Sequence, residues 1–291
     1  MINRHYLVLW TAVLCLSFGI ARSEKSFAKE KELKPDELVA AHLKSIGSPQ
    51  VLAKVKSRVF TGTTMVHFRL GATGQLTGGQ ARFVSEGRKL GIVMSFGALE
   101  YPGEHFAFNG ENVTVGHINP GQKSPLADFI NRYGDLMKEG LLGGALSVGW
   151  PLLEVQERKP KLKSGNRKIA GRQLHELEYR PAKGLGDIKV KMYFDPETFH
   201  HLRTEYGLRI SSAMGARTED AKIMKDVPDT IYQLLEQFDD FREVDGMMLP
   251  HHYTIDFSVE GQGRTFLARW TIEASQWMHN GQIDPQFFEA K

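Results

Sequence analysis

The chain has 291 residues, a formal net charge of +3 and a single cysteine, and 41% of its residues are hydrophobic. This length is ample for one large hydrophobic core or two small ones. No block of Lys and Arg interleaved with aromatic residues occurs in the sequence, which argues against a nucleic-acid partner. With one cysteine there is no intrachain disulfide and no thiolate metal site, so stability depends on buried apolar surface.

Residues 1–23 have the three-part layout of a secretory signal peptide. Arg4 and His5 precede an uncharged, mostly apolar run over residues 6–20. As a helix this run spans about 22 Å, less than the roughly 30 Å hydrocarbon core of a bilayer. We expect cleavage near Ala21 or Ser23 and export to the periplasm, which argues against a nucleotide ligand. The alternative is an uncleaved membrane anchor.

Cleavage would change two properties of the mature chain. It removes Cys15, and it removes Arg4 and Arg22, which lowers the formal net charge from +3 to +1. Attachment of a lipid to Cys15 is a further alternative. It is disfavoured because a lipobox needs a small residue before the cysteine, and here that residue is Leu14.

Residues 24–34 are rich in Lys and Glu and are expected to form a charged, disordered tail. A helix is predicted from Pro35 to Gly47, because Pro opens it, Gly closes it and apolar residues recur at helical spacing. From residue 59 to residue 115 the apolar residues alternate with polar ones, which indicates β-strands. Asn109-Gly110 predicts a hairpin, since both residues tolerate a positive φ.

Residues 125–153 interrupt this alternation. Apolar residues occur at i, i+3, i+4 and i+7 up to residue 137, and an almost uncharged, glycine-rich run follows over residues 140–153. Each glycine weakens a helix by about 1 kcal/mol relative to alanine. This segment is the least polar part of the mature chain.

Strands are predicted again after the interruption, at residues 174–179, 188–194, 201–208, 232–241, 248–259 and 265–274. In residues 188–194 the even positions are apolar and two of the odd positions are Lys, so one face is buried and the other is wet. No βαβ alternation, repeat or Pro/Ser-rich linker occurs. We therefore expect one domain over residues 35–291, built on one antiparallel sheet that is strongly curved or nearly closed.

No catalytic, metal or cofactor site is predicted. The run from Gly116 to Ser124 resembles a phosphate loop, but Gln122 stands where the motif needs Lys, so we expect an ordinary loop. The pairs His200-His201 and His251-His252 do not suit a metal ion, because neighbouring residues of a strand point to opposite faces.

The apolar side chains of residues 125–153 are the candidate functional residues. One hypothesis is a mobile lid or the wall of a cavity for acyl chains, since the glycines allow movement and a curved sheet can enclose a ligand. The alternative is ordinary core that plugs the mouth of the sheet. The candidates for lining or lid are Leu126, Phe129, Ile130, Leu136, Leu141, Leu142, Leu146 and Trp150.

Several short segments resemble the outer-membrane lipoprotein carrier (LolA-like) superfamily, most clearly between residues 172 and 288. They are YRP at 179–181, FDPET at 194–198, FDDFREVDG at 238–246, LPH at 249–251, WTI at 270–272 and NGQID at 280–284, together with DELVAAHLKSIG at 36–47. The resemblance implies a half-open β-barrel with helices across its concave face and an apolar cavity for lipids or lipoprotein acyl chains. It also implies an arginine that latches the lid, for which Arg69, Arg82, Arg88 and Arg132 are candidates.

The function expected from these features is a non-enzymatic periplasmic carrier of lipid or acylated lipoprotein. The mature protein is expected to be soluble and monomeric, with an envelope membrane protein as a further partner and no nucleotide, nucleic acid or cofactor. The alternative is an envelope protein-interaction or stress-sensing module that uses the same fold without a lipid. An envelope hydrolase is a third, weaker possibility, because no catalytic group of residues stands out.

Overall fold

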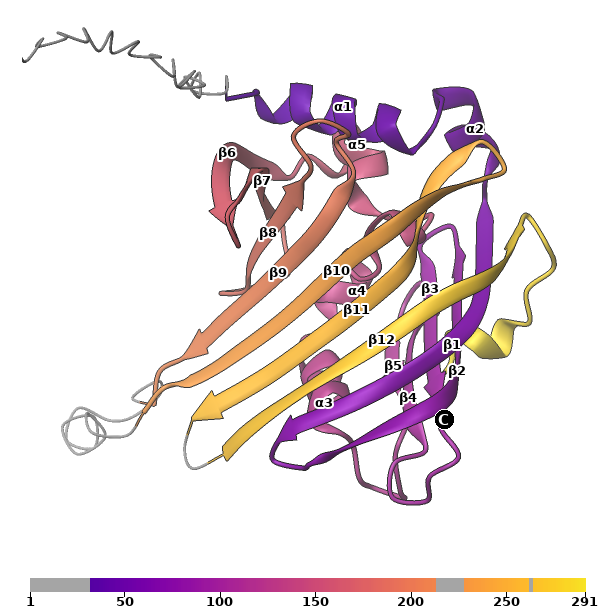
Figure 1. Ribbon diagram of the computed structural model, residues 1–291, viewed down its shortest axis with the longest axis vertical. Helices are drawn as coiled ribbons and strands as arrows, with labels where there is room; N and C mark the ends of the chain where they lie inside the picture. Colours follow the sequence, from indigo (N-terminus) through magenta and orange to yellow (C-terminus); the bar gives the residue numbers. More distant parts are fainter. Residues whose placement is uncertain (1–31, 213–227, 262–263) are drawn as a thin grey trace, which may run out of the picture. The chain divides into compact units, whose positions relative to one another are not determined.

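A sheet of twelve strands dominates the computed structural model, which describes residues 32–212, 228–261 and 264–291 (Figure 1). Neighbouring strands are antiparallel throughout, in the order β5-β4-β3-β2-β1-β12-β11-β10-β9-β8-β7-β6. The strands are β1 (Ser57–Leu70), β2 (Gly74–Glu86), β3 (Lys89–Ser95), β4 (Gly103–Phe108), β5 (Val113–Val115), β6 (Lys161–Ile169), β7 (Arg172–Arg180), β8 (Lys189–Phe194), β9 (His201–Ile210), β10 (Thr230–Val244), β11 (Met247–Gly261) and β12 (Arg264–His279). The expected antiparallel sheet is confirmed.

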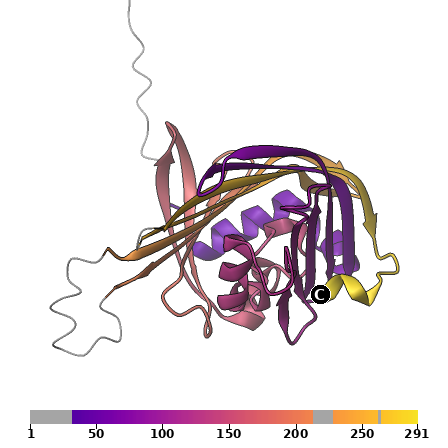
Figure 2. The ribbon, with the colours of Figure 1, turned by 90° about the horizontal axis from the view of Figure 1, so that it is seen from below.

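The sheet is unclosed, and its two edges are neighbours in the sequence. β1 pairs with β12 in the middle of the sheet, so the first and last strands of the chain lie side by side there. β5 and β6 form the edges. The chain that leads from one edge to the other, residues 116–160, carries most of the helices, and Figure 2 shows the strands arching over them. This arrangement agrees with a half-open barrel.

We call residues 125–158 the covering segment. Its elements are α3 (Pro125–Arg132), α4 (Asp135–Lys138), η1 (Gly144–Leu146), η2 (Pro151–Glu154) and α5 (Val155–Arg158). Outside it lie α1 (Pro35–Ile46) and α2 (Pro49–Lys54) near the start of the described residues, and η4 (Pro285–Phe288) near the C-terminus. α1 contacts β6, β11 and η2, so it lies against both the sheet and the covering segment.

Several expected elements are confirmed, with small differences. α1 buries Leu38, Val39, His42 and Ile46 on one face, as its periodicity predicts. The hairpin at residues 109–110 joins β4 to β5. The helix expected up to residue 137 is broken, because α3 ends at Arg132 and α4 begins at Asp135. Beyond it the glycine-rich run forms only short 3₁₀ turns, as the low helix propensity of glycine requires.

Among the elements that the sequence did not predict are β6 and α2. β6 was missed because its outward positions, among them Lys161, Lys163 and Arg167, are charged and its inward positions are not a clean apolar series. α2 was missed because it has only six residues and buries none of them fully. Residues 1–31 lie outside the described residues, and so do the expected leader and residues 24–31 of the expected charged tail.

Candidate functional site

The eight apolar side chains predicted as cavity lining or lid lie inside the core. Each is between 0 and 4% exposed, and all belong to one cluster with the inward face of the sheet. They are Leu126, Phe129, Ile130, Leu136, Leu141, Leu142, Leu146 and Trp150. The covering segment therefore occupies the concave face with its own side chains, and a lid function for it stays a prediction.

The first half of the covering segment is held by helix capping and ring contacts. Ser124 Oγ accepts the N–H of Ala127 at 2.9 Å, which caps the start of α3. One turn later, the ring of Phe129 packs on Tyr232 of β10 and Phe257 of β11, with centroids 5.5 and 5.3 Å away. These contacts fix the helical half of the covering segment against the sheet.

A buried carboxyl group lies beside the cap of α3. Glu104 of β4 accepts the hydroxyl of Tyr101 at 2.6 Å, and that hydroxyl in turn accepts the indole N–H of Trp270 at 2.7 Å. Ser124 also hydrogen-bonds Glu104. Burial raises the pKa of Glu104 to about 7, because the charged form loses its hydration.

In the second half, the sheet supplies polar side chains to the backbone of the covering segment. Arg58 of β1 is 3% exposed and donates to the carbonyls of Ala145 and Leu146, the latter at 3.1 Å. It also donates to Met247 Sδ at 3.2 Å and to His279 Nε2 at 3.1 Å. These four acceptors are two carbonyl oxygens, a thioether sulfur and an imidazole nitrogen, so none of them carries a negative charge that would offset the charge of Arg58. Burial therefore lowers the pKa of Arg58 to about 10, which still leaves it charged at neutral pH.

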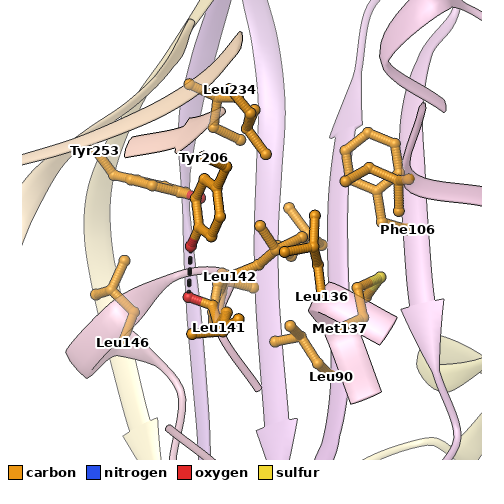
Figure 3. Packing of buried hydrophobic residues seen from close by; sticks show 14 of the residues in the cluster. Leu90, Phe106, Leu136, Met137, Leu141, Leu142, Leu146, Tyr206, Leu234 and Tyr253 are labelled. Carbon is orange, nitrogen blue, oxygen red and sulfur yellow. Dashed lines mark hydrogen bonds between the residues drawn. The ribbon is translucent and has the colours of Figure 1, made fainter. Parts of the chain in front are cut away.

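Glu236 of β10 holds the same turn from the other side. It is fully buried and accepts the N–H of Gly143 at 2.7 Å and the hydroxyls of Tyr206, at 2.6 Å, and Tyr253. The hydroxyl of Tyr206 also lies 2.9 Å from the carbonyl of Leu141 (Figure 3). Burial raises the pKa of Glu236.

Trp150 packs against two buried imidazole rings, which also contact each other. Its ring is 5.0 Å from that of His42 on α1, edge-on, and 4.9 Å from that of His201 on β9, stacked. Burial lowers the pKa of His42 to about 4 and also lowers the pKa of His201. Both rings are therefore neutral near pH 7, and they act as aromatic core.

Two further side chains hold the end of this half. Ser85 Oγ on β2 accepts the N–H of Val148 at 3.2 Å. Arg158 of α5 donates to the carbonyls of Glu139 and Gly149 at 2.9 and 3.2 Å, which closes residues 139–158 into a loop. We call the four residues Arg58, Ser85, Arg158 and Glu236 the clamps.

An apolar groove of about 1000 Å³ opens where α1 and α2 meet the covering segment. Its lining comes from α1, α2 and the residues that follow them, from the turn at Gly87, and from the last part of the covering segment. The apolar members are Ala40, Leu43, Pro49, Leu52, Ala53, Val55, Val148 and Leu153, and the charged members are Lys44, Lys56 and Glu154. None of the eight predicted residues lines this groove, although the predicted segment supplies one of its walls.

The clamps were not predicted from the sequence. The resemblance left Arg69, Arg82, Arg88 and Arg132 as candidates for a latch, and Arg58 is not among them. Of these four, Arg132 belongs to the covering segment itself and pairs with Asp128, and Arg88 donates to Lys138 O of that segment at 3.0 Å. A signal was present, however: Arg58 is in phase with the buried Phe60, and Glu236 is in phase with the buried Leu234 and Phe238.

The histidine pairs do not converge on a common site. His251 bonds Leu249 O and the indole of Trp277, whereas His252 pairs with Glu273 at 2.6 Å. Among the described residues, no group of three His, Cys, Asp or Glu side chains is arranged to hold a metal ion. The run from Gly116 to Ser124 is a loop that leads into α3, as expected.

No family model matches the sequence, and neither does any curated protein. The solved structures that align with the fold include the Pseudomonas aeruginosa MucA/MucB complex and MucB in complex with MucA(peri). Each has 10% sequence identity and covers 81% of this chain and 94% of the other, at TM-scores of 0.21 and 0.20. Likeness at this level does not bear on function.

The described part of the chain was also searched for membrane-spanning helices. None of its helices combines the length and the apolar character needed to cross a bilayer.

Proposed function

We propose that the protein binds and carries the acyl chain of a lipid or of an acylated lipoprotein, and that it catalyses no reaction. The observation that carries this proposal is the apolar groove between α1, α2 and the covering segment. Its volume of about 1000 Å³ lies at the upper end of the range for small-molecule sites. A long alkyl chain suits such a lining, because each methylene taken out of water contributes about 0.8 kcal/mol.

The charges at the groove favour an anionic head group. Lys44 and Lys56 line it and are exposed. Glu154 also lines it, but Arg158 binds its carboxylate at 2.8 Å and offsets its charge. An amphiphile with an anionic head group could therefore place its chain on the apolar residues and its head group near the two lysines.

We further infer that the second half of the covering segment is the lid of this groove. Val148 and Leu153 form part of the groove wall, and the helices on either side of Val148, η1 and η2, have only three and four residues. The clamps hold this stretch by hydrogen bonds to its backbone. Their release would extend the groove toward the apolar concave face of the sheet, at a cost set by the buried groups left unpaired.

The leader-like residues 1–23 support export, so we place this function in the periplasm. There the protein would act as a soluble monomer, without cofactor, nucleotide or nucleic acid, and would deliver its cargo to or receive it from an envelope membrane protein. The alternative remains a protein-interaction or stress-sensing module in which the groove binds an apolar protein segment.

The test is to fill the groove and measure acyl-chain binding. Ala53→Trp and Ala40→Trp each place an indole in the groove from an exposed position on a helix, so the core is untouched. The protein is purified under native conditions, co-purifying lipids are identified by mass spectrometry, and a fluorescent fatty acid is titrated. We expect the unaltered protein to bind the probe, and both variants to bind it at least tenfold more weakly.

Ala72→Trp, at an exposed turn outside the groove, is the matched control and should bind as the unaltered protein does. Polar substitutions at Leu142 or Leu146 would be a poor test, since both side chains are buried in the core. A protein that carries no lipid and ignores the probe would refute the carrier function. An apolar peptide that binds, and that Ala53→Trp displaces, would favour the interaction module.

A further inference from the structure

Positive charge is concentrated in one part of the sheet. Residues 159–191, which contain β6, β7 and β8, include ten Lys or Arg and three Asp or Glu, whereas the whole chain has a net charge of only +3. The excess of seven positive charges in this stretch means that the rest of the chain is net negative. Such asymmetry points to an anionic partner rather than to a requirement of the fold.

The strand register places three of these cations in a row on the outer face. Lys161 of β6 pairs with Arg180 of β7. The pairing of Tyr179 with Val190 sets Arg180 beside Lys189 of β8. Strands lie about 4.8 Å apart, so the row spans about 10 Å. The side chains of Tyr179 and Val190 are buried in the core, so the cations alternate with them and face outward.

The neighbouring row along the same strands is different. There Lys191 pairs with Glu178 at 3.5 Å and also reaches Glu176 at 3.1 Å, so its positive charge is compensated within the sheet. Like charges placed opposite each other destabilise a sheet. The row of three cations therefore lowers the stability of the fold. The neighbouring row, in which Lys191 is paired with Glu176 and Glu178, has no such cost.

Protection of a sheet edge explains only part of this pattern. Lysines on an edge strand prevent pairing with other chains, and this accounts for Lys161 and Lys163 on β6. It does not account for Arg180 and Lys189, because β7 and β8 are paired on both sides.

The row borders a shallow hollow that is open to an approaching anion. A depression of about 530 Å³ is lined by Lys161, Arg180 and Lys189 together with Gly186 and Asp187 from the turn between β7 and β8. A second depression of about 330 Å³ continues from Lys189 across β9. It passes Gly207, where an added Cβ would meet nothing within 4 Å.

We propose that the outer face of β6, β7 and β8 docks on a membrane surface that carries anionic phospholipids. The cations are spread over a face rather than gathered in a groove, since exposed Lys183 lies in the turn between β7 and β8, and exposed Arg167 and Lys168 lie at the far end of the β6–β7 hairpin. A charged bilayer offers phosphates over a comparable area, and each Lys or Arg near it contributes about fivefold to binding. This docking is independent of the groove, so it holds whether or not the groove binds an acyl chain.

The test is vesicle flotation. The purified protein is mixed with vesicles of phosphatidylcholine alone or with about one third phosphatidylglycerol. We expect binding only to the anionic vesicles and its loss in about 1 M salt, where the Debye length is about 3 Å. The variant K161Q/R180Q/K189Q should bind at least tenfold more weakly. The control K54Q/R69Q/K291Q removes the same charge elsewhere and should bind within about twofold of the unaltered protein.

Both variants alter exposed side chains, and melting temperatures no lower than that of the unaltered protein would show that they fold. The proposal is overturned if the unaltered protein ignores anionic vesicles or if both variants lose binding equally. It is also overturned if an acidic peptide, rather than the vesicles, binds the patch. The groove variant A53W should float as the unaltered protein does, so failure of the carrier function is distinguishable from failure of docking.

Discussion

The two halves of the covering segment contribute equally buried side chains to the core, but they satisfy their backbones in different ways. In α3 the backbone bonds within its own turn, as between Asp128 N and Ser124 O at 2.8 Å. In the glycine-rich half, the N–H of Gly143 bonds Glu236 and the carbonyls of Ala145 and Leu146 bond Arg58. A segment without regular structure can be buried here only because the sheet supplies inward polar side chains.

The largest effect is expected from a cavity in the helical half. Phe129→Ala removes a ring that is 2% exposed and lies between Tyr232 and Phe257. It should lower the free energy of unfolding by about 3–5 kcal/mol, measured by urea denaturation. Tyr133→Ala, at the half-exposed end of the same helix, should cost clearly less. Equal losses would show that α3 is not held by this ring.

The next effect is expected from loss of a clamp. Arg58→Leu leaves the carbonyls of Ala145 and Leu146 without their donor and should cost about 2–4 kcal/mol. Unlike Phe129→Ala, Arg58→Leu should loosen only the residues around the turn that it holds. Amide hydrogen exchange should accelerate at residues 141–150 and stay slow in α3. The exposed Arg69→Leu serves as the control, and equal acceleration in α3 would contradict separate anchoring of the two halves.

A smaller effect is expected where the clamped turn approaches the sheet. At Gly143 φ is +81°, and an added Cβ would lie 2.4 Å from Phe83 Cζ. Gly121 has a similar φ of +77° and open space around it. In thermal unfolding Gly121→Ala should cost about 1 kcal/mol from backbone strain alone, and Gly143→Ala about 2–3 kcal/mol. Equal costs would mean that the turn is free to move away from Phe83.

The smallest effect is expected on the pH dependence of the free energy of unfolding. The pKa of Glu104 is raised by burial from its ordinary 4.5 to about 7, so its protonated form is favoured in the folded protein. Its stabilising contribution is complete below pH 4.5 and is lost as pH rises through 7. Between pH 5 and 7 this loss should be about 1–2 kcal/mol, and Glu104→Gln should abolish it.

The measurement is the difference in unfolding free energy between Glu104→Gln and the unaltered protein across this range. The pKa of His42 is lowered to about 4, so the protein becomes less stable as pH falls below 6.5. This effect is the same in both proteins and cancels in the difference between them. Glu111→Gln, in the exposed turn between β4 and β5, should keep the original slope. An unchanged slope in Glu104→Gln would show that the carboxyl is charged in the folded state.

Much of the fold follows from local pattern. α1, the hairpin at residues 109–110 and the long strands after residue 172 could be predicted because their apolar residues repeat with the period of their own secondary structure. β6 could not, since an edge strand has little apolar surface to reveal it. The clamps left a weaker signal, because Arg58 and Glu236 stand at inward positions where an apolar residue is the usual choice.

The sequence by itself determined that residues 125–153 are covered by something, since so apolar a stretch cannot remain in water. It also determined the alternation that gives the sheet a wet face and a dry one. Only the tertiary structure decided that these side chains fill the concave face, and that the open groove lies beside them against α1 and α2. The same holds for the row of Lys161, Arg180 and Lys189. Both results depend on the pairing of segments far apart in the chain, and local propensity does not encode that pairing.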